Sequence, residues 1–457
     1  MKYISTRSDK YKVDSAEAIK TGIAPDGGLF VPEEIPQITL GEIESFASLS
    51  YAELAKKILS LYLTDYTDSE LSDCVSGAYT SEKFGSDEIA PLHKLDGKAS
   101  VLELWHGPTC AFKDMALQIL PHFLVKAIKK TGEDRDVIIL VATSGDTGKA
   151  ALEGFKDVKG TKIQVFYPVC GVSKIQKLQM ATQDGSNVSV ISVDGNFDDA
   201  QTGVKKIFGN QEYVNEASDL GYVFSSANSI NWGRLVPQIV YYFYAYSRLV
   251  KTGEIKCGDK INIVVPTGNF GNILAAFYAK EMGLCVDKLI CASNQNNVLT
   301  DFIKTGVYDR NRKFETTISP SMDILISSNL ERLLFHMSGK NFKLVKEYMT
   351  SLSENGKYSV DKDIFDKISN VFRAGYCDDD ETKATIKSTF EKYNYTIDTH
   401  TAVAKNVYDK YTENTGDETK TVIASTANPY KFNKAVLEAI SNGELPEGEF
   451  ELIDLLH

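Results

Sequence analysis

The sequence lacks the features that mark membrane-spanning, secreted and metal-binding proteins. No stretch reaches the roughly 18 consecutive apolar residues that a transmembrane helix requires. Residues 1–9 contain no apolar run of the kind that directs secretion, so we expect a cytoplasmic protein that contacts no membrane. The 6 histidines form no HxH or HxxxH pair, and the sequence therefore predicts no metal site.

Cysteine pairs and positive charge are also scarce. The 7 cysteines are scattered, odd in number and without a CxxC pair, which is typical of reduced thiols in a cytosolic compartment. The 50 basic residues are outnumbered by 62 acidic ones, giving a net charge of −12. Nucleic acid is therefore excluded as the main partner, and an anionic ligand must be held locally by helix N-termini, glycine-rich loops or a few cations.

At 457 residues the chain is too long for one ordinary core, and we expect two or three domains. From Val101 onward, β-rich apolar segments alternate with helical segments, which predicts an α/β fold with parallel sheets covered by helices on both faces. Strands are expected at 137–142, 163–167, 188–193, 261–265, 289–292 and 420–424, and helices at 147–155, 173–182, 197–208, 232–250 and 271–282. The acidic run at 378–381 is expected to be a solvated helix end or loop.

Three junctions after predicted strands carry small polar residues suited to an anion. The first contains Ser144, Gly145, Asp146 and Thr147, the second is Gly268, Asn269, Phe270, Gly271 and Asn272, and the third contains Ser425 and Thr426. Taken singly, each junction is explained by helix capping. Three in one chain, all after strands, favour a cofactor with an anionic group.

Two common phosphate-binding loops are excluded. A Walker loop needs glycine at position 143, where this chain has Thr143. A dinucleotide fingerprint, GxGxxG, is absent from residues 266–272. The cofactor must therefore be of another kind.

Lys113 lies where the apolar segment 101–105 breaks at Gly107 and a helical segment begins. Apolar neighbours and a helix N-terminus both lower the pKa of a lysine, which can then act as a nucleophile or base. The alternative is a solvated lysine next to Asp114. A polar segment with Asn228, Asn231 and Arg234 leads into an aromatic-rich helix, where it either binds a second anion or caps the helix.

Together these segments resemble the threonine synthase family, which consists of pyridoxal-phosphate enzymes of fold type II, the tryptophan-synthase-β-like fold. The resemblance covers nearly the whole chain. The matching segments, in the order of the family, are 6–7, 24–32, 106–114, 142–148, 194–199, 228–232, 266–272, 320–324, 327–332 and 398–403.

The resemblance implies two helix-covered, mostly parallel sheets with pyridoxal 5'-phosphate at the domain interface, plus a small N-terminal domain. We expect residues 1–93 to form a mostly helical N-terminal domain or lid. Residues 94–133 and 222–457 are expected to form the large cofactor-binding domain, and residues 134–221 a small α/β domain.

The resemblance also assigns roles to residues. It implies that Lys113 is the Schiff-base lysine, that the Gly268–Asn272 loop holds the cofactor phosphate, and that Thr426 bonds the pyridine nitrogen. Binding of the substrate carboxylate is expected at Ser144, Gly145, Asp146 and Thr147, and binding of the substrate phosphate at Asn228, Asn231 and Arg234.

Two positions depart from the family pattern. Asp146 stands where many relatives of this fold carry an asparagine that bonds the phenolic oxygen of the cofactor, and an ionised carboxylate would repel a phenolate. Either Asp146 turns away, or another amide such as Asn269 makes that contact. The usual Asp-Pro-His-Thr is altered to Asp-Thr-His-Thr at 398–401, which need not affect the chemistry.

The implied reaction converts O-phospho-L-homoserine and water to L-threonine and phosphate, by γ-elimination and β-addition, as the last step of threonine biosynthesis. The expected partner is this substrate, and the expected assembly is a monomer or weak homodimer. Two alternatives remain open. One is another fold type II enzyme such as a serine/threonine dehydratase or cysteine synthase, and the other is a non-catalytic binding protein.

Overall fold

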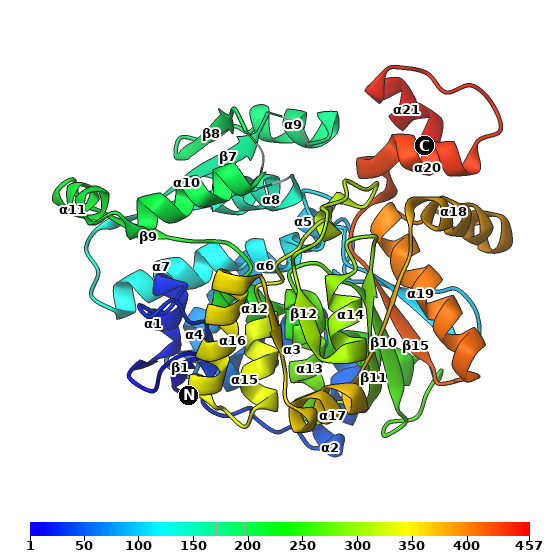
Figure 1. The fold of residues 1–457 in the computed structure, drawn as a ribbon, viewed down its shortest axis with the longest axis horizontal. Coiled ribbons are helices and arrows are strands. Elements are labelled where there is room, and N and C mark those ends of the chain that lie inside the picture. Colours follow the sequence, from blue (N-terminus) through cyan, green and yellow to red (C-terminus); the bar gives the residue numbers. More distant parts are fainter. Residues whose placement is uncertain (144, 170–171, 196) are drawn as a thin grey trace.

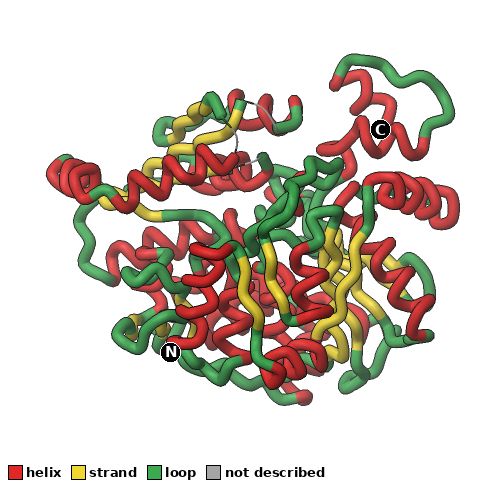
Figure 2. Tube along the Cα trace, viewed as in Figure 1, coloured by secondary structure: helices red, strands yellow, loops and turns green. Residues whose placement is uncertain are grey.

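The computed structural model describes residues 1–143, 145–169, 172–195 and 197–457. Most of its strands gather in two separate, mostly parallel sheets (Figures 1 and 2). The larger sheet has the order β14-β11-β10-β15-β5-β4. Its strands are β4 (Leu92–Lys94), β5 (Ala99–Glu103), β10 (Ile261–Pro266), β11 (Val286–Ser293), β14 (Phe372–Tyr376) and β15 (Thr421–Ser425). All neighbours in it are parallel except β4 and β5.

Both faces of the larger sheet are covered, as its uninterrupted apolar strands predict. Val264 and Ile423 lie in one apolar cluster with Val403 and Val407 of α19 (Thr399–Thr415). The alternate side chains belong to the main core on the opposite face, where α13 (Gly271–Glu281) packs on β10 and α12 (Trp232–Lys251) packs on α13. At one edge, α14 (Val298–Thr305) contacts β11 and β14.

The smaller sheet has the order β8-β7-β6-β9 and is entirely parallel. Its strands are β6 (Asp136–Ala142), β7 (Thr161–Pro168), β8 (Val188–Val193) and β9 (Tyr222–Ser225), and its helices are α8 (Asp146–Phe155), α9 (Lys174–Ala181), α10 (Phe197–Gly209) and α11 (Gln211–Asp219). The expected boundary at residue 222 is wrong by one strand, because β9 pairs with β6 rather than with the larger sheet.

The N-terminal residues do not build a separate core. They comprise a small sheet of β1 (Tyr3–Ser5), β2 (Lys12–Val13) and β3 (Phe30–Pro32), and helices α1 (Ser15–Thr21), α2 (Leu40–Ser45), α3 (Tyr51–Tyr62), α4 (Asp68–Ala78) and α5 (Ser81–Phe84). The rings of Tyr3 and Tyr62 lie 5.4 and 5.5 Å from that of Trp232 on α12. The expected division at residue 93 therefore does not separate two cores, because the N-terminal segment packs into the main one.

The remaining elements lie outside these three groups. They are α6 (Asp114–Leu117), α7 (Leu120–Lys130), β12 (Val307–Asp309), β13 (Lys357–Ser359), α15 (Leu330–Met337), α16 (Phe342–Asn355), α17 (Lys362–Val371), α18 (Asp379–Tyr393), α20 (Asn433–Ile440), α21 (Glu449–Leu456) and the 3₁₀ turns η1 (Phe46–Ser48), η2 (Pro320–Met322) and η3 (Pro429–Phe432). Across the described ranges, no helix combines the length and apolarity needed to cross a bilayer. The short helix α6 lies between the two sheets in Figure 1, and its contacts with α8 and α12 join the two halves.

Candidate active site

The segment before α6 is a tight turn whose geometry requires glycine. A Cβ atom on Gly107 would lie 2.5 Å from the Cβ of Asp114, closer than such atoms approach. The carboxylate of Asp114 accepts hydrogen bonds from the N–H and the hydroxyl of Thr109, both at 2.8 Å. This closed turn ends at Lys113, the residue that immediately precedes α6.

Main-chain contacts hold the Lys113 segment against the end of β15. The N–H of Phe112 donates to the carbonyl of Thr426 at 2.8 Å, and Ala111 and Ala427 form an isolated antiparallel bridge. The predicted Lys113 and Thr426 sites, more than 300 residues apart in sequence, are therefore neighbours. The third sequence-predicted junction therefore meets the Lys113 segment here.

The Lys113 amine is buried beside polar groups from two other elements. Its Nζ lies 3.4 Å from Asp146 Oδ2 and 3.4 Å from Ser321 Oγ, and 5.0 Å from the centre of the Phe112 ring. Burial lowers the pKa of Lys113, and the charges of Lys431 and Arg234 lower it further, against the opposing effect of Asp146. The expected lysine with a lowered pKa is thus present, and the solvated alternative is wrong.

Asp146 is buried between two ammonium groups. Its Oδ1 lies 3.1 Å from Lys431 Nζ and accepts a hydrogen bond from Gln176 Nε2 at 2.8 Å. Although burial opposes ionisation, the charges of Lys431 and Lys113 hold the pKa of this carboxyl well below its usual range. Asp146 is therefore an anion that faces the lysine, and it does not turn away.

The loop from Gly268 to Asn272 packs against the main chain of Ser321, whose hydroxyl faces Lys113. A Cβ atom on Gly268 would lie 2.7 Å from the carbonyl oxygen of Ser321, so only glycine fits there. Phe270 adopts a left-handed conformation with φ of 62° and leads directly into α13. Because the N–H of Leu274 donates to the carbonyl of Phe270, the N–H groups before it point out of the helix N-terminus, where they suit an anion.

The two asparagines of this loop have different surroundings. Asn272 is buried, and its Oδ1 accepts hydrogen bonds from the hydroxyls of Tyr241 and Tyr242. Its Nδ2 has no partner among the described residues, although it is fully buried. Asn269 is exposed, and its Oδ1 accepts from the Ser328 hydroxyl. The unpartnered donor of Asn272 is the one that fits a ligand.

Of the two hydroxyls after β15, one is already in use. Ser425 Oγ accepts hydrogen bonds from Trp105 Nε1 and the Thr401 hydroxyl, both at 2.9 Å. In the described part of the chain, no hydrogen bond involves the hydroxyl of the buried Thr426. Thr426 therefore keeps a neutral donor and acceptor for a ligand.

The loop before α8 is held by Thr143. Its hydroxyl accepts hydrogen bonds from the N–H groups of Gly145 and Gly148 at 3.0 and 2.9 Å. Gly145 has φ of 148°, and a Cβ there would lie 2.6 Å from the Gln176 side chain. Thr147 is half-buried at the helix start, and Ser144, also predicted as a substrate contact, lies outside the described residues.

Arg234 and Asn231, both predicted to bind the substrate phosphate, differ in what remains free. The buried Arg234 donates from Nη1 to the carbonyl of Ala227 at 2.9 Å, and its Nε has no partner in the described structure. Burial lowers the pKa of this guanidinium to about 10. The Asn231 side chain instead caps α12, and its Nδ2 donates to two main-chain carbonyls. Its predicted ligand role is therefore replaced by a structural one.

Several residues that complete the site have no role predicted from the sequence. Ser321 and His400 lie in segments that match the family, and their only signal was that match. The Ser321 N–H donates to His400 Nε2 at 3.1 Å, which requires a ring unprotonated at that nitrogen. Gln176 and Lys431 carried no local signal, because tertiary packing alone brings them to Asp146.

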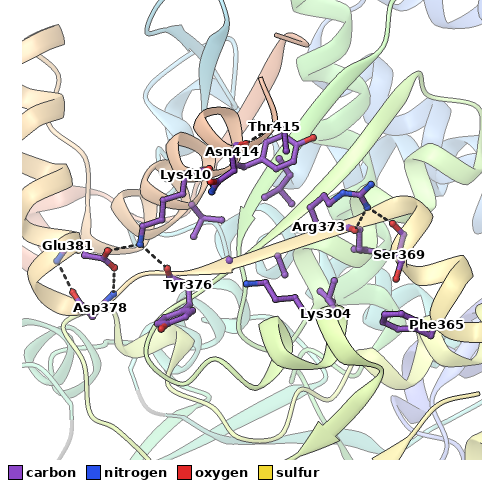
Figure 3. Close-up of a pocket in the computed structure, with 17 residues that line it drawn as sticks. Lys304, Phe365, Ser369, Arg373, Tyr376, Asp378, Glu381, Lys410, Asn414 and Thr415 are labelled. Carbon is purple, nitrogen blue, oxygen red and sulfur yellow. Dashed lines mark hydrogen bonds and ion pairs between the residues drawn. The ribbon is translucent and has the colours of Figure 1, made fainter. Parts of the chain in front are cut away.

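A cavity of about 630 Å³ lies elsewhere, along β14 and between α17 and α19 (Figure 3). Lys304, Phe365 and Arg373 are among its lining residues, and none of the site residues described above lines it. The candidate active site is therefore the region around Lys113, where the chemically distinctive groups converge.

Models of three family segments match the chain. The "Threonine synthase N terminus" model matches residues 2–79, the "Pyridoxal-phosphate dependent enzyme" model matches residues 88–426, and the "Threonine synthase, C-terminal" model matches residues 401–456. Together these models cover nearly the whole chain.

Individual proteins agree with the family models. "Threonine synthase-like 1" of Homo sapiens is 42% identical over 96% of this chain, which spans 60% of that relative's length. "Threonine synthase" of Saccharomyces cerevisiae is 39% identical over 96% of this chain and 89% of its own. The crystal structure of pyridoxal-phosphate-bound threonine synthase from Brucella melitensis has a TM-score of 0.89 and 38% identity, covering 99% of this chain and 94% of that one.

These matches confirm the predicted fold class, family and cofactor. The site geometry fits that cofactor, because the described structure has an unpartnered buried amide at Asn272, an open helix N-terminus at α13 and a buried amine at Lys113. The chain belongs to the threonine synthase family of pyridoxal-phosphate-dependent enzymes.

Proposed function

We propose that the chain is a threonine synthase, which converts O-phospho-L-homoserine and water to L-threonine and phosphate. The observation that carries the proposal is the buried amine of Lys113, which is joined to the glycine loop of α13 and the buried cation Arg234 in one site. Family models described as threonine synthase segments match both ends of the chain, and they support this reaction over others of the fold.

Pyridoxal phosphate, when bound, supplies an electron sink for carbanion chemistry. Lys113 would hold it covalently, the N-terminus of α13 with Gly268 and Asn272 would hold its phosphate, and Thr426 would meet its ring nitrogen. A neutral hydroxyl at that position leaves the ring nitrogen unprotonated. The free donors in the structure and the family resemblance support these assignments.

Lys113 also moves protons in this proposal. Its lowered pKa favours the neutral amine, which can take the proton from Cα of the substrate. The phosphate then leaves from Cγ and water adds at Cβ, with hydrogens moving among Cα, Cβ and Cγ. A single amine that reaches one face of the substrate can serve most of these transfers.

Two surfaces of the site suit the two anionic ends of the substrate. The start of α8, at Gly145 and Thr147, offers a helix N-terminus to the carboxylate. Arg234 offers a cation and an unused Nε–H to the phosphate, and the half-buried Asn228 lies in the loop that leads to its helix. Among the charged groups that act on Lys113, the positive charges of Lys431 and Arg234 outweigh the negative charge of Asp146, so this part of the site suits an anion within an acidic protein.

The products formed from different substrates test this proposal. Holoenzyme supplied with O-phospho-L-homoserine should release phosphate and form threonine, and should form little 2-oxobutyrate or pyruvate from threonine or serine. Keto acid as the main product would support a dehydratase instead. The relative named "Threonine synthase-like 1" gives weight to a second candidate, a cofactor-binding protein without synthase activity, which would show cofactor absorbance and no turnover.

A further inference from the structure

Lys431 is a buried ammonium group that has no role in the proposed chemistry so far. It lies in η3, the next element after β15 in the chain, and is 4% exposed. Its Nζ donates to the carbonyl of Thr109 at 2.8 Å and to Gln179 Oε1 at 3.1 Å, and lies 3.1 Å from Asp146 Oδ1. An ammonium has three N–H donors, so these partners use all of them. Lys431 is therefore fully occupied by protein groups and has no donor left for a ligand.

The contacts of Asp146 divide between its two oxygens. Oδ1 is fixed by Lys431 and by Gln176 Nε2 at 2.8 Å. Oδ2 faces the reacting side of the site, 3.4 Å from Lys113 Nζ and 3.3 Å from Ser321 Oγ. These distances are longer than those at Oδ1, so Oδ2 can adjust its position when the protonation of Lys113 changes.

A buried carboxylate left without a cation is strongly destabilised. Lys113 must lose its proton to act as a base, and it must exchange its bond to the cofactor, so it cannot remain a constant partner for Asp146. Lys431 takes part in neither change, and it is the closer of the two ammonium groups. Its charge therefore compensates Asp146 throughout the reaction.

We propose that Lys431 is a positioning residue that acts through Asp146, keeping this carboxylate ionised with Oδ2 directed at Lys113 while the Lys113 nitrogen gains and loses protons. The proposal rests on the proposed function, in which Lys113 is the base. It also explains how an aspartate is tolerated where an asparagine is usual, because the Lys431–Asp146 pair is neutral as a unit.

Several other titratable groups face this pair. Arg234 lies close enough to Lys113 to lower its pKa, and His400 lies close enough to Asp146 to affect the pKa of that carboxyl. Asp114 and Cys110 lie close enough to Lys431 for its charge to act on them. The variants below leave all four unchanged, so a difference between them and the wild type reports on the Lys431–Asp146 pair.

The first test is the pH dependence of the visible absorbance of the holoenzyme, which follows protonation of the nitrogen of Lys113. In Lys431→Met, the Lys113 nitrogen becomes the main cationic partner of Asp146. The Lys113 nitrogen therefore holds its proton more firmly, and the titration midpoint should rise by about one pH unit. The matched control is Lys434→Met, the same change at an exposed lysine one turn later, which should leave the midpoint in place. A midpoint unchanged in Lys431→Met would overturn the proposal.

A double-mutant cycle separates this role from general structural support. Lys431→Met should lower kcat about tenfold or more with KM within about threefold, and in an Asp146→Asn background it should cause little further loss. Losses that multiply would show that Lys431 does not act through Asp146. If Lys431→Met does not fold, Gln179→Leu removes one of the three contacts and should move the midpoint in the same direction by less. An unmoved midpoint there would also count against the proposal.

The absorbance titration needs the cofactor but no substrate. Failure of the wild-type chain to make threonine would therefore defeat the proposed function and leave this measurement in place. Normal threonine formation with an unmoved midpoint in the Lys431 variant would defeat only the positioning role.

Discussion

At the scale of single residues, the site depends on close approaches that only certain side chains permit. The clearest is at Gly268, where a Cβ would lie 2.7 Å from the main-chain oxygen of Ser321. Because the obstacle is backbone rather than a flexible side chain, the loop cannot accept a methyl group without moving. That loop carries the N–H groups assigned to the cofactor phosphate.

Gly268→Ala should therefore weaken binding of pyridoxal phosphate about five- to hundredfold, which corresponds to about 1–3 kcal/mol of overpacking. Equilibrium titration of apoprotein with the cofactor, followed by absorbance, measures the change. Gly41→Ala is the matched control, because a Cβ there meets nothing within 4 Å. Equal affinities in the two variants would show that the loop does not hold the cofactor.

At the scale of elements, local sequence determines where several helices begin. The acidic run at 378–381, expected to be a helix end or loop, is the start of α18. The Asp378 side chain accepts from the N–H of Glu381 at 2.8 Å, and the Glu381 side chain accepts from the N–H of Asp378 at 3.2 Å. This reciprocal capping box satisfies donors that the first helical turn leaves unpaired.

Asp378→Ala should lower the free energy of unfolding by about 1 kcal/mol, because it removes the cap and one favourable charge at the helix start. Urea denaturation followed by circular dichroism gives the value. Asp380→Ala removes an exposed acid from the same turn without touching the cap and should cost less. A larger loss at Asp380 than at Asp378 would contradict the capping account.

The same contrast between local and tertiary information explains which elements could be predicted. Strands β10 and β15 contain runs of Val and Ile and are buried along their whole length, so their sequences identify them. Strand β14, with the sequence FRAGY, contains arginine and glycine and lies at a sheet edge, and it was missed. Helix α19 was also missed, since its polar face and internal threonines weaken the helical pattern.

The site shows the same limit. Lys113 and the junctions that carry glycines and hydroxyls could be predicted. Each of them follows a predicted strand, or the end of an apolar segment, in its own local sequence. Lys431, Gln176 and Ser321 could not be predicted from their neighbours, because only the packing of η3, α9 and η2 around Asp146 gives them a role.

At the scale of the whole molecule, stability should depend on pH through a histidine that is not one of the active-site residues. His336 on α15 is held in hydrogen-bond contact with the Tyr278 hydroxyl at 2.8 Å. Burial lowers its pKa from 6.5 to about 4, and the charges of Lys340 and Arg332 act in the same direction. Between these two pH values the folded protein binds fewer protons than the unfolded chain.

The free energy of unfolding should therefore rise as the pH increases from about 4 to 6.5. The contribution of His336 to this rise is up to about 3 kcal/mol, and it is lost again as the pH falls through the same window. His336→Gln, which keeps a hydrogen-bonding side chain but does not titrate, should flatten this part of the profile. His457→Gln, at the exposed C-terminal residue, should not. Thermal unfolding across the pH range distinguishes them, and parallel profiles for wild type and His336→Gln would refute the assignment.

The whole-molecule architecture brings the end of β15, the α13 loop and the start of α8 to Lys113 from both sheets. This convergence is the basis of the proposed threonine synthase activity, in which Lys113 is the anchor and base. The most direct measurement is the yield of threonine per phosphate released from O-phospho-L-homoserine, for the wild-type holoenzyme, Lys113→Ala and the exposed-lysine control Lys177→Met. We predict one threonine per phosphate for the wild type and Lys177→Met, and a loss on the order of a thousandfold or more in Lys113→Ala. Phosphate release without threonine, or turnover retained in Lys113→Ala, would contradict the claim.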